Sequence, residues 1–217
     1  MLSIVATPIG NLEDITYRAV RILSEADAIL CEDTRTSSNL LNHYSIRRPL
    51  VSFHAHSSPA KIEVIISRLL AGEHLAIISD AGTPGISDPL YALLGRAIEA
   101  WIEVSPIPGP SAVITALCAS GLHMHDFRFL GFIPIKKWRH TLLTSLKTKD
   151  YTVAIYESVH RIEHTLADIE EYFWGDTPVV IGRELTKKFE EFLRMSVSDM
   201  RKHFQEHPPK WEFVVMW

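Results

Sequence analysis

The sequence predicts an α/β protein with two domains, and two observations lead to that expectation. Short apolar segments alternate with segments whose apolar residues recur at helical spacing, which is typical of βαβ units and a mostly parallel sheet. In the second half, several apolar segments are separated only by short turns, which favours a mixed sheet. We therefore expect a doubly wound domain at residues 1–122 and a smaller α/β domain at residues 123–217.

The first half contains the clearest alternation. Apolar runs predict strands at residues 2–6, 26–31, 50–53, 75–78 and 102–105. Apolar periodicity predicts helices near residues 15–23, 62–70, 90–98 and 112–120. Asp14 and Asp88 are expected to cap two of these helices, with Pro89 in the first helical position, where no donor is needed.

Residues 121–126 are the expected hinge between the domains. Beyond it, apolar runs predict strands at residues 129–133, 153–156, 179–182, 189–195 and 213–216. Apolar residues from 162 to 173 have the spacing of one helix face.

Composition and charge limit the functional classes. The 217 residues suffice for two modest domains, and 47% apolar and 22% charged residues are ordinary for a soluble globular protein. A net charge of −4 excludes a generally basic nucleic-acid coat but leaves room for a local basic patch.

Cysteine and apolar patterns indicate a cytoplasmic protein. Cys31 and Cys118 are too few and too far apart for a disulfide framework, and no Cys-x2-Cys pair is present to predict a zinc site. Residues 1–20 lack a secretory pattern, and no apolar run reaches the roughly 18 residues that suggest a membrane span. We expect no metal and no membrane contact.

The loop at residues 78–89 follows an apolar strand and precedes a helical pattern. Gly82 and Gly85 allow unusual backbone angles, and Asp80 stands at the strand tip. Ligands of open α/β sheets bind at the carboxyl ends of strands. By spacing alone, this stretch is equally well a ligand loop or a tight turn with a helix cap.

An ordered set of motifs runs along nearly the whole chain. In sequence they are Thr7-Pro8-Ile9-Gly10-Asn11-Leu12, Glu32-Asp33-Thr34-Arg35, Ser79-Asp80-Ala81-Gly82-Thr83-Pro84, Pro108-Gly109-Pro110-Ser111-Ala112, Tyr156-Glu157-Ser158, His160-Arg161 and Arg183-Glu184-Leu185-Thr186-Lys187. The set resembles the ribosomal RNA small subunit methyltransferase I family of the tetrapyrrole (class III) methylase superfamily. Any single motif would be weak, but their order and spacing are highly specific.

The resemblance implies an enzyme that uses S-adenosylmethionine to methylate the 2′-oxygen of a cytidine in the decoding region of small-subunit rRNA. It also implies a homodimer and a cofactor held in the cleft between two α/β domains. Carried over by position, the residues expected at the cofactor are Pro8, Gly10, Asp80, Ala81, Gly82, Thr83, Pro108, Gly109, Ser111, Ala112, Tyr156, Glu157, Ser158, Arg183 and Glu184.

The sequence departs from the family pattern in three places. Val159 replaces the usual proline before His-Arg, and Trp211 replaces the glycine that normally precedes the final strand. The indole of Trp211 either narrows the cofactor pocket or packs outward. The helical C-terminal extension of longer members has no counterpart after Trp217, which leaves its rRNA contacts in question.

Catalysis on a ribose hydroxyl benefits from a base or from a cation that stabilises the developing oxyanion. Glu32, Asp33 and Arg35 follow a strand on the predicted ligand side, so we rank them first; an ion-paired helix start is the alternative. Other candidates are His54, His56, Glu157, His160, Arg161, Arg183, Glu184 and Lys187. Arg183 and Glu184 would alternatively pair with each other, and no single base is identified.

The best local signal for RNA binding is the cluster of Lys136, Lys137 and Arg139 around an aromatic residue. Cations beside an aromatic ring contact phosphates and stack on unpaired bases. His160 and Arg161 are further candidates for RNA contacts, and Arg47 and Arg48 would extend the basic patch. The alternative without a function in RNA binding is a charged helix face in contact with solvent.

Two other functions remain open. A small-molecule methylase acting on a tetrapyrrole-like substrate would have a deep apolar pocket beside the cofactor. A non-catalytic RNA-binding or ribosome-binding relative would fail to bind S-adenosylmethionine.

Overall fold

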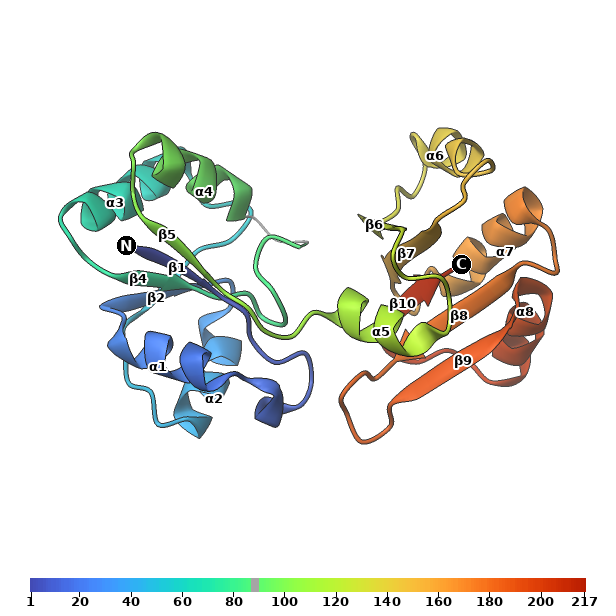
Figure 1. Ribbon diagram of the computed structural model, residues 1–217, viewed down its shortest axis with the longest axis horizontal. Helices are drawn as coiled ribbons and strands as arrows, with labels where there is room; N and C mark the ends of the chain where they lie inside the picture. Colours follow the sequence, from blue (N-terminus) through green and yellow to red (C-terminus); the bar gives the residue numbers. More distant parts are fainter. Residues whose placement is uncertain (87–89) are drawn as a thin grey trace. The chain divides into compact units, whose positions relative to one another are not determined.

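The computed structural model describes residues 1–86 and 90–217, which form two compact units, Met1–Ser111 and Ala112–Trp217 (Figure 1). The expected cap Asp88 and the expected first helical residue Pro89 lie outside the described residues. The units divide before helix α5 (Ala112–Ser120) rather than after residue 122, because α5 packs against the strands of the second unit.

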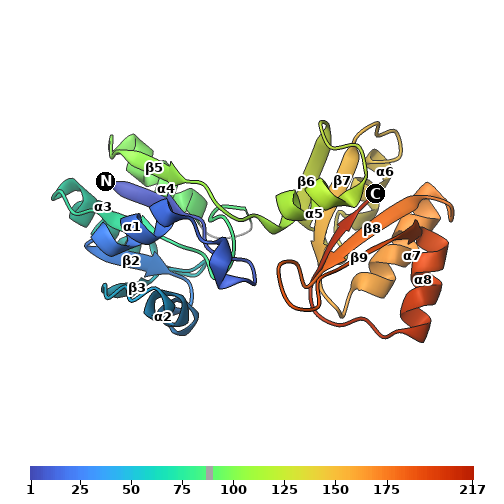
Figure 2. The same cartoon turned by 60° about the horizontal axis from the view of Figure 1, so that its bottom comes forward.

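The first unit is a parallel five-stranded sheet with the order β3-β2-β4-β1-β5. Its strands are β1 (Leu2–Val5), β2 (Ala28–Cys31), β3 (Leu50–Ser52), β4 (Leu75–Ile77) and β5 (Val104–Ile107). Its helices are α1 (Tyr17–Glu25), α2 (Thr34–His43), α3 (Pro59–Leu70) and α4 (Leu90–Glu99). Figure 2 shows the sheet between these helices.

Two apolar cores hold the helices to the sheet. One contains Leu30 and Leu75 with residues of α3 and α4, and the other contains Ile29 and Ala76 with residues of α1 and α2. Consecutive strand residues thus face opposite cores, as the alternation of side chains along a strand requires. Both faces of the sheet are covered. Because all its strands run parallel, their carboxyl ends lie at one edge.

Helix starts in this unit follow local capping chemistry. Thr16 caps α1 by accepting the N–H of Ala19, and Ser58 caps α3 by accepting the N–H of Lys61. The prediction that Asp14 caps the first helix is wrong. Asp14 lies in a short 3₁₀ turn, Leu12–Asp14, that precedes α1.

The second unit is a mixed five-stranded sheet with the order β6-β7-β10-β8-β9. Its strands are β6 (Phe127–Phe132), β7 (Thr152–Glu157), β8 (Pro178–Arg183), β9 (Glu191–Ser196) and β10 (Phe213–Met216). Only β6 and β7 pair in parallel, whereas β7–β10, β10–β8 and β8–β9 are antiparallel. The expected mixed sheet is confirmed, although it has as many strands as the first.

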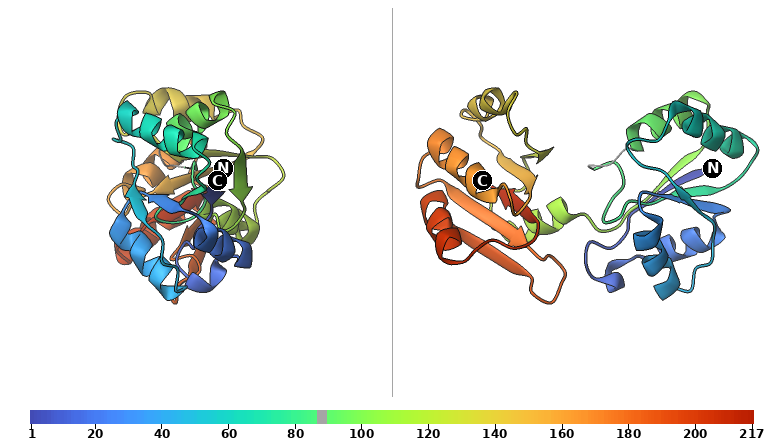
Figure 3. Two further views of the ribbon diagram at one scale, coloured as in Figure 1. Left: turned by 90° about the vertical axis from the view of Figure 1, so that its left-hand side faces the viewer. Right: turned by 180° about the vertical axis from the view of Figure 1, so that it is seen from behind.

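Three further helices belong to the second unit, α6 (Arg139–Ser145), α7 (Ile162–Phe173) and α8 (Val197–Glu206). Residues of α7 and α8 form one core with the sheet, together with Phe213 and Trp217. Figure 3 shows α7 and α8 on one side of this sheet and α5 on the other. No described helix is long and apolar enough to cross a bilayer.

Four of the five tryptophans, all within the described residues, have a positive φ. The values are 57° for Trp101, 70° for Trp138, 82° for Trp174 and 73° for Trp211, and each side chain is largely exposed. A bulky residue in this left-handed region is a conformational outlier, whereas glycine enters it freely.

Helix ends show how closely one of these tryptophans replaces a glycine. Helix α3 ends with Gly72 at φ 95°, and the next N–H bonds back five residues to Arg68. Helix α4 ends with the same bond from Ile102 to Ala97, and Trp101 occupies the place of the glycine. That place in a helix C-terminus is usually taken by glycine.

Candidate active site

Loops after β1 and β4 are joined at the carboxyl edge of the first sheet. Thr7 donates its N–H to the carbonyl of Gly82 at 2.9 Å, and Gly82 returns a bond to the carbonyl of Thr7 at 3.1 Å. The Thr7 hydroxyl also donates to the carbonyl of Ser79 at 3.2 Å. Two predicted ligand loops are therefore one hydrogen-bonded unit.

Glycine is required at two places where these loops meet their neighbours. Gly82 has φ 80°, and a Cβ there would lie 3.3 Å from Cγ2 of Ile9. A Cβ on Gly109, in the loop after β5, would lie 2.9 Å from Cβ of Ala6. Thr83 ties this third loop to the other two by donating its hydroxyl to the carbonyl of Pro110 at 2.9 Å.

The loop after β2 joins the same edge through Asp80. The N–H of Asp33 donates to Oδ1 of Asp80 at 3.2 Å, and no other described group hydrogen-bonds the Asp80 carboxylate. Asp80 is exposed. The structure therefore brings the Glu32–Arg35 segment and the Asp80 loop together, as their strand-end positions predict.

Asp33 is the N-cap of α2 and the partner of Arg35. Its Oδ1 accepts the Arg35 N–H at 2.8 Å, and its Oδ2 lies 2.9 Å from Nη2 of Arg35. The hydrogen bonds from the Arg35 side chain and backbone lower the pKa of Asp33 to about 2, and the same pairing raises the pKa of Arg35. A carboxylate with so low a pKa is a weak proton acceptor, so the geometry supports a capping role for Asp33.

Cys31, at the end of β2, is buried beneath this segment. Burial raises the pKa of its thiol, the charges of Asp80 and Asp33 raise it further, and the nearby Ser37 hydroxyl acts in the opposite direction. The buried thiol therefore stays protonated and behaves as a packed side chain.

A cavity of about 310 Å³ opens among the joined loops and α2. Its lining consists of Thr7, Pro8, Ile9, Gly10, Leu12, Thr36, Ser37, Asn39, Leu40, Ile78, Ser79, Asp80 and Ala81. Four predicted cofactor residues, Pro8, Gly10, Asp80 and Ala81, thus border one cavity. The others in the first unit, Gly82, Thr83, Pro108, Gly109 and Ser111, lie in the adjoining loops.

The α2 wall of this cavity begins at the ion-paired helix start that the sequence offered as the alternative for Glu32–Arg35. Thr36, Ser37 and Asn39 lie in the polar segment after Glu32-Asp33, where apolar periodicity is too weak to predict a helix. The available signal was Asp33 itself, because an Asp directly after a buried strand is a typical helix cap.

In the second unit, Glu157 at the end of β7 is fully buried and well paired. Oε2 accepts the Thr165 hydroxyl at 2.6 Å, Oε1 accepts the Ser158 N–H at 2.8 Å, and Nε of Arg161 lies 3.3 Å from Oε1. The neighbouring Tyr156 ring packs edge-on against Phe129, and burial raises the pKa of its hydroxyl. These contacts fix the Tyr156–Ser158 segment from within its own unit.

Arg139 continues the buried network instead of lying on the surface as predicted. Its guanidinium donates to Asp168 at 2.5 Å, to the Thr165 hydroxyl at 3.0 Å and to the carbonyl of Pro134 at 3.0 Å. Only 6% of Arg139 is exposed. Its role in the structure is to anchor α6, because each of its three guanidinium nitrogens donates to a partner.

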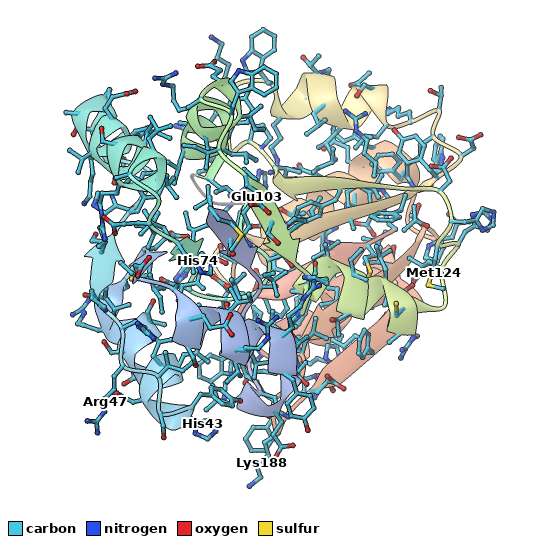
Figure 4. All side chains as sticks on the ribbon, turned by 60° about the vertical axis from the view of Figure 1, so that its left-hand side comes forward. His43, Arg47, His74, Glu103, Met124 and Lys188 are labelled. Carbon is cyan, nitrogen blue, oxygen red and sulfur yellow. The ribbon has the colours of Figure 1, made fainter. Side chains whose placement is uncertain are left out.

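Lys136 and Lys137 do lie on the surface, directly before α6. The ammonium of Lys137 is 5.3 Å from the centre of the exposed Trp138 ring. His160 is exposed, whereas Arg161 is half-buried against Glu157 and the carbonyl of Ile133. Arg47 belongs to the first unit and lies at its surface (Figure 4).

Arg183 and Glu184, at the end of β8, have separate partners. Arg183 bonds Glu191 at 2.5 Å, and Glu184 bonds Lys187 at 2.8 Å, so the alternative in which they pair with each other is wrong. Lys187 in turn lies 6.0 Å from the ring of Trp211, which is 60% exposed. Figure 4 shows Lys188 of the same loop projecting from the molecular surface.

No group of three or more His, Cys, Asp or Glu side chains suited to a metal is found among residues 1–86 and 90–217.

Comparison with known proteins relates the chain to one family. Residues 1–201 match the model of the tetrapyrrole (corrin/porphyrin) methylases. Ribosomal RNA small subunit methyltransferase I of Thermotoga maritima is 46% identical over 99% of this chain and 96% of its own length. The protein of that name from Pasteurella multocida is 46% identical over 96% of this chain and 74% of its own.

Solved structures with low sequence identity share the fold. Diphthine synthase superposes with a TM-score of 0.78 at 14% identity, covering 99% of this chain and 88% of that one. Uroporphyrin-III-C-methyltransferase from Thermus thermophilus gives 0.69 at 18% identity, covering 99% and 93%. Sequence and fold thus agree, and the chain belongs to the ribosomal RNA small subunit methyltransferase I family of the tetrapyrrole methylases.

Proposed function

We propose that the protein transfers the methyl group of S-adenosylmethionine to the 2′-oxygen of a cytidine in the decoding region of small-subunit rRNA. The observation that carries the proposal is the joined set of loops at the carboxyl edge of the first sheet, in a chain of this family. The names of the relatives support methylation of small-subunit rRNA, and the family resemblance supports the ribose oxygen and the site.

The residues of the first unit fit such a cofactor. Gly82 and Gly109 let the loops pack closely against one another, because a Cβ at either position would meet Ile9 or Ala6. Asp80 presents a carboxylate oxygen without a described partner, which suits the donor groups of an adenosine or an amino acid. Ala81, Thr83, Pro108, Ser111 and Ala112 complete the proposed contacts of these loops. Tyr156, Glu157, Ser158, Arg183 and Glu184 are proposed contacts from the second unit.

When bound, the cofactor supplies an electrophilic methyl group on a sulfonium. The protein's part is then to hold the accepting oxygen in line with that methyl group, which is worth roughly 7–11 kcal/mol in well-oriented reactions. Loops that are tied to one another are suited to this task, and the Thr7–Gly82 and Thr83–Pro110 bonds tie these loops together. Asp33 is held ionised by Arg35 and contributes charge and position. Of the three catalytic candidates, Glu32 and Arg35 remain the proposed groups near the reacting oxygen.

We assign recognition of rRNA to Lys136 and Lys137. His160, which precedes Arg161 in the sequence, is a further proposed contact. Lys136, Lys137 and His160 are exposed, as phosphate contacts require. Arg139 and Arg161 support this region from inside. The proposal also includes a homodimer in the cytoplasm, as the resemblance implies.

The test uses S-adenosylmethionine with a labelled methyl group and small ribosomal subunits from cells that lack their own enzyme. Label on one cytidine 2′-oxygen of the decoding region, located by ribose-methylation mapping, is the expected result. Naked rRNA is tested as a second substrate, and a variant impaired in cofactor binding serves as the negative control. Cofactor binding without label in RNA would favour a small-molecule methylase, and absence of both would favour a non-catalytic relative.

A further inference from the structure

The cavity in the first unit has a wall that the proposed cofactor loops do not explain. Besides the loops after β1 and β4, it is lined by Thr36, Asn39 and Leu40 of α2 and by Leu12. We propose that this α2 wall receives the target nucleoside, turned out of the RNA, and reads a base that carries an exocyclic amine. This inference rests on the proposed function, which names RNA as the substrate.

Size and surface of the cavity suit a single nucleoside. Its volume of about 310 Å³ lies at the lower end of the roughly 300–1,000 Å³ typical of ligand sites. The side chains of Ile9, Leu12 and Leu40 give it apolar walls, which pack against the faces of a flat base. Enzymes that act on a nucleotide within structured RNA or DNA must first take it out of the stack.

Polar groups of the cavity favour a ligand that donates hydrogen bonds. The Asp80 carboxylate uses Oδ1 for the Asp33 N–H. An ionised carboxylate has about four acceptor positions, so Asp80 can accept from the bound cofactor and from the amine of a base at the same time. Carboxylates read the exocyclic amine of cytosine, and amides such as that of Asn39 bond base edges in both directions. Uracil offers a carbonyl at the place of that amine, so a carboxylate discriminates against it.

The charges around the cavity suit a nucleoside whose base lies inside the cavity and whose phosphates lie outside it. Asp80 and Asp33 make the interior side anionic, which disfavours a phosphate there. Arg35 directly precedes the lining residue Thr36, and its side chain is 90% exposed. An exposed guanidinium beside an anionic pocket fits a nucleoside inside with its flanking phosphate outside.

The competing occupant is the adenosine of the cofactor, because the same loops are proposed to hold it. The two assignments differ in one measurable respect. If the α2 wall takes the substrate nucleoside, cytidine and S-adenosylhomocysteine bind the protein together. If the cavity takes the adenosine, they compete.

The experiment titrates cytidine, at millimolar concentrations, into the isotope-labelled protein saturated with S-adenosylhomocysteine and follows amide signals by NMR. We expect shifts at Leu12, Thr36, Asn39 and Leu40, and binding of uridine weaker by about three- to tenfold, the value of one hydrogen bond. Displacement of S-adenosylhomocysteine by cytidine, equal affinity for uridine, or shifts confined to other residues would overturn the proposal.

A pair of asparagines on α2 provides the matched control. Asn39 lines the cavity, whereas Asn42, three residues on and also exposed, does not. Asn39→Ala should weaken cytidine binding and raise the KM for small subunits by about three- to tenfold, with unchanged affinity for S-adenosylmethionine. Asn42→Ala should change none of these.

The outcomes also separate this inference from the proposed function. Equal effects of Asn39→Ala and Asn42→Ala would refute the nucleoside wall while the enzyme still methylates RNA. Failure of the wild-type protein to label RNA would instead refute the proposed function itself.

Discussion

The backbone N–H of Asp33 donates a hydrogen bond to Oδ1 of Asp80, and this bond joins the ends of two neighbouring strands, β2 and β4. It gives Asp80 two separable properties. One oxygen holds a loop, and the carboxylate places a negative charge at the cavity.

Substitution of Asp80 should distinguish these properties. Asp80→Asn keeps an acceptor for the Asp33 N–H but removes the charge, whereas Asp80→Ala removes both. We expect both variants to bind S-adenosylmethionine about ten- to a hundredfold more weakly in calorimetry, as loss of a charged hydrogen bond predicts. The melting temperature of the apo protein should fall slightly for Asp80→Ala only. Unchanged affinity in both variants would remove Asp80 from the cofactor site.

Asp33 should affect stability in a pH-dependent way. Its pKa is about 2 in the folded protein against an ordinary 3.8, so its pairing with Arg35 stabilises the fold above pH 3.8 and is lost as the pH falls toward 2. The stability difference between the wild type and Asp33→Asn should therefore be constant from pH 7 to about 5 and shrink below pH 4. Urea unfolding at several pH values measures it. A difference that grows toward low pH would contradict the assignment.

Arg139 should matter for stability. Removing one partner of a buried ion pair typically costs about 3–5 kcal/mol, so Arg139→Ala should unfold at clearly lower urea concentration than the wild type. Arg139→Lys should restore little, because one ammonium cannot serve Asp168, Thr165 and the Pro134 carbonyl at once. Equilibrium unfolding checks both. Wild-type stability of Arg139→Ala would show that the network is dispensable.

Lys136 and Lys137 should behave in the opposite way. The double substitution Lys136→Glu with Lys137→Glu leaves the buried network intact, so the melting temperature should stay within about 2 °C of the wild type. Methylation of small subunits should fall about tenfold or more, and more steeply at low salt, because phosphate contacts are electrostatic. The affinity for S-adenosylmethionine is the internal control. Normal methylation would place the RNA contacts elsewhere.

Gly109 and Gly95 form a second matched pair. A Cβ on Gly109 would lie 2.9 Å from Cβ of Ala6, whereas nothing lies within 4 Å of a Cβ on Gly95 in α4. Gly109→Ala should displace the loop after β5 and weaken cofactor binding, with a cost of about 1–3 kcal/mol in stability. Gly95→Ala should stabilise by about 0.5–1 kcal/mol, as expected in a helix. Thermal melts and calorimetry on both variants decide the point.

The left-handed tryptophans should be improved by glycine. Trp101→Gly and Trp174→Gly should each raise stability by about 1 kcal/mol, because relief of backbone strain exceeds the entropy that glycine adds to the unfolded chain. Trp217→Gly is the contrasting control, since Trp217 is buried in the core and its removal should cost about 3–5 kcal/mol. Destabilisation by Trp101→Gly would show that the exposed indole contributes contacts of its own.

Much of the fold could be predicted from sequence because buried strands and amphipathic helices leave strong periodic patterns. Strand β10 and helix α7 begin and end at the predicted residues, and α5 does as well. Helix α2 was expected only as an alternative, an ion-paired helix start, because its buried face consists of Ser37 and Leu41 only, which gives no apolar period. Helix α8 was missed, as its polar and charged residues mask three buried apolar ones.

The site was predictable in its loops but not in its pairings. Parallel strands put the loops that follow them at one edge of the sheet, so Gly10, Asp33 and Asp80 could be expected at the same edge. That β2, β4 and β1 are neighbours in the sheet is seen only in the structure. Which partner a charged side chain takes depends on three-dimensional neighbours distant in sequence. Arg139 looks like a surface cation in its local context, and only the positions of Asp168 and Thr165 reveal that it is buried.

The four left-handed tryptophans show where backbone strain lies in this protein. At Trp101, Trp138, Trp174 and Trp211 the backbone geometry selects glycine, while the one tryptophan at an ordinary position, Trp217, is packed in the core. The strained positions are therefore exposed turns and helix ends, where exchange of a side chain leaves the packed core intact.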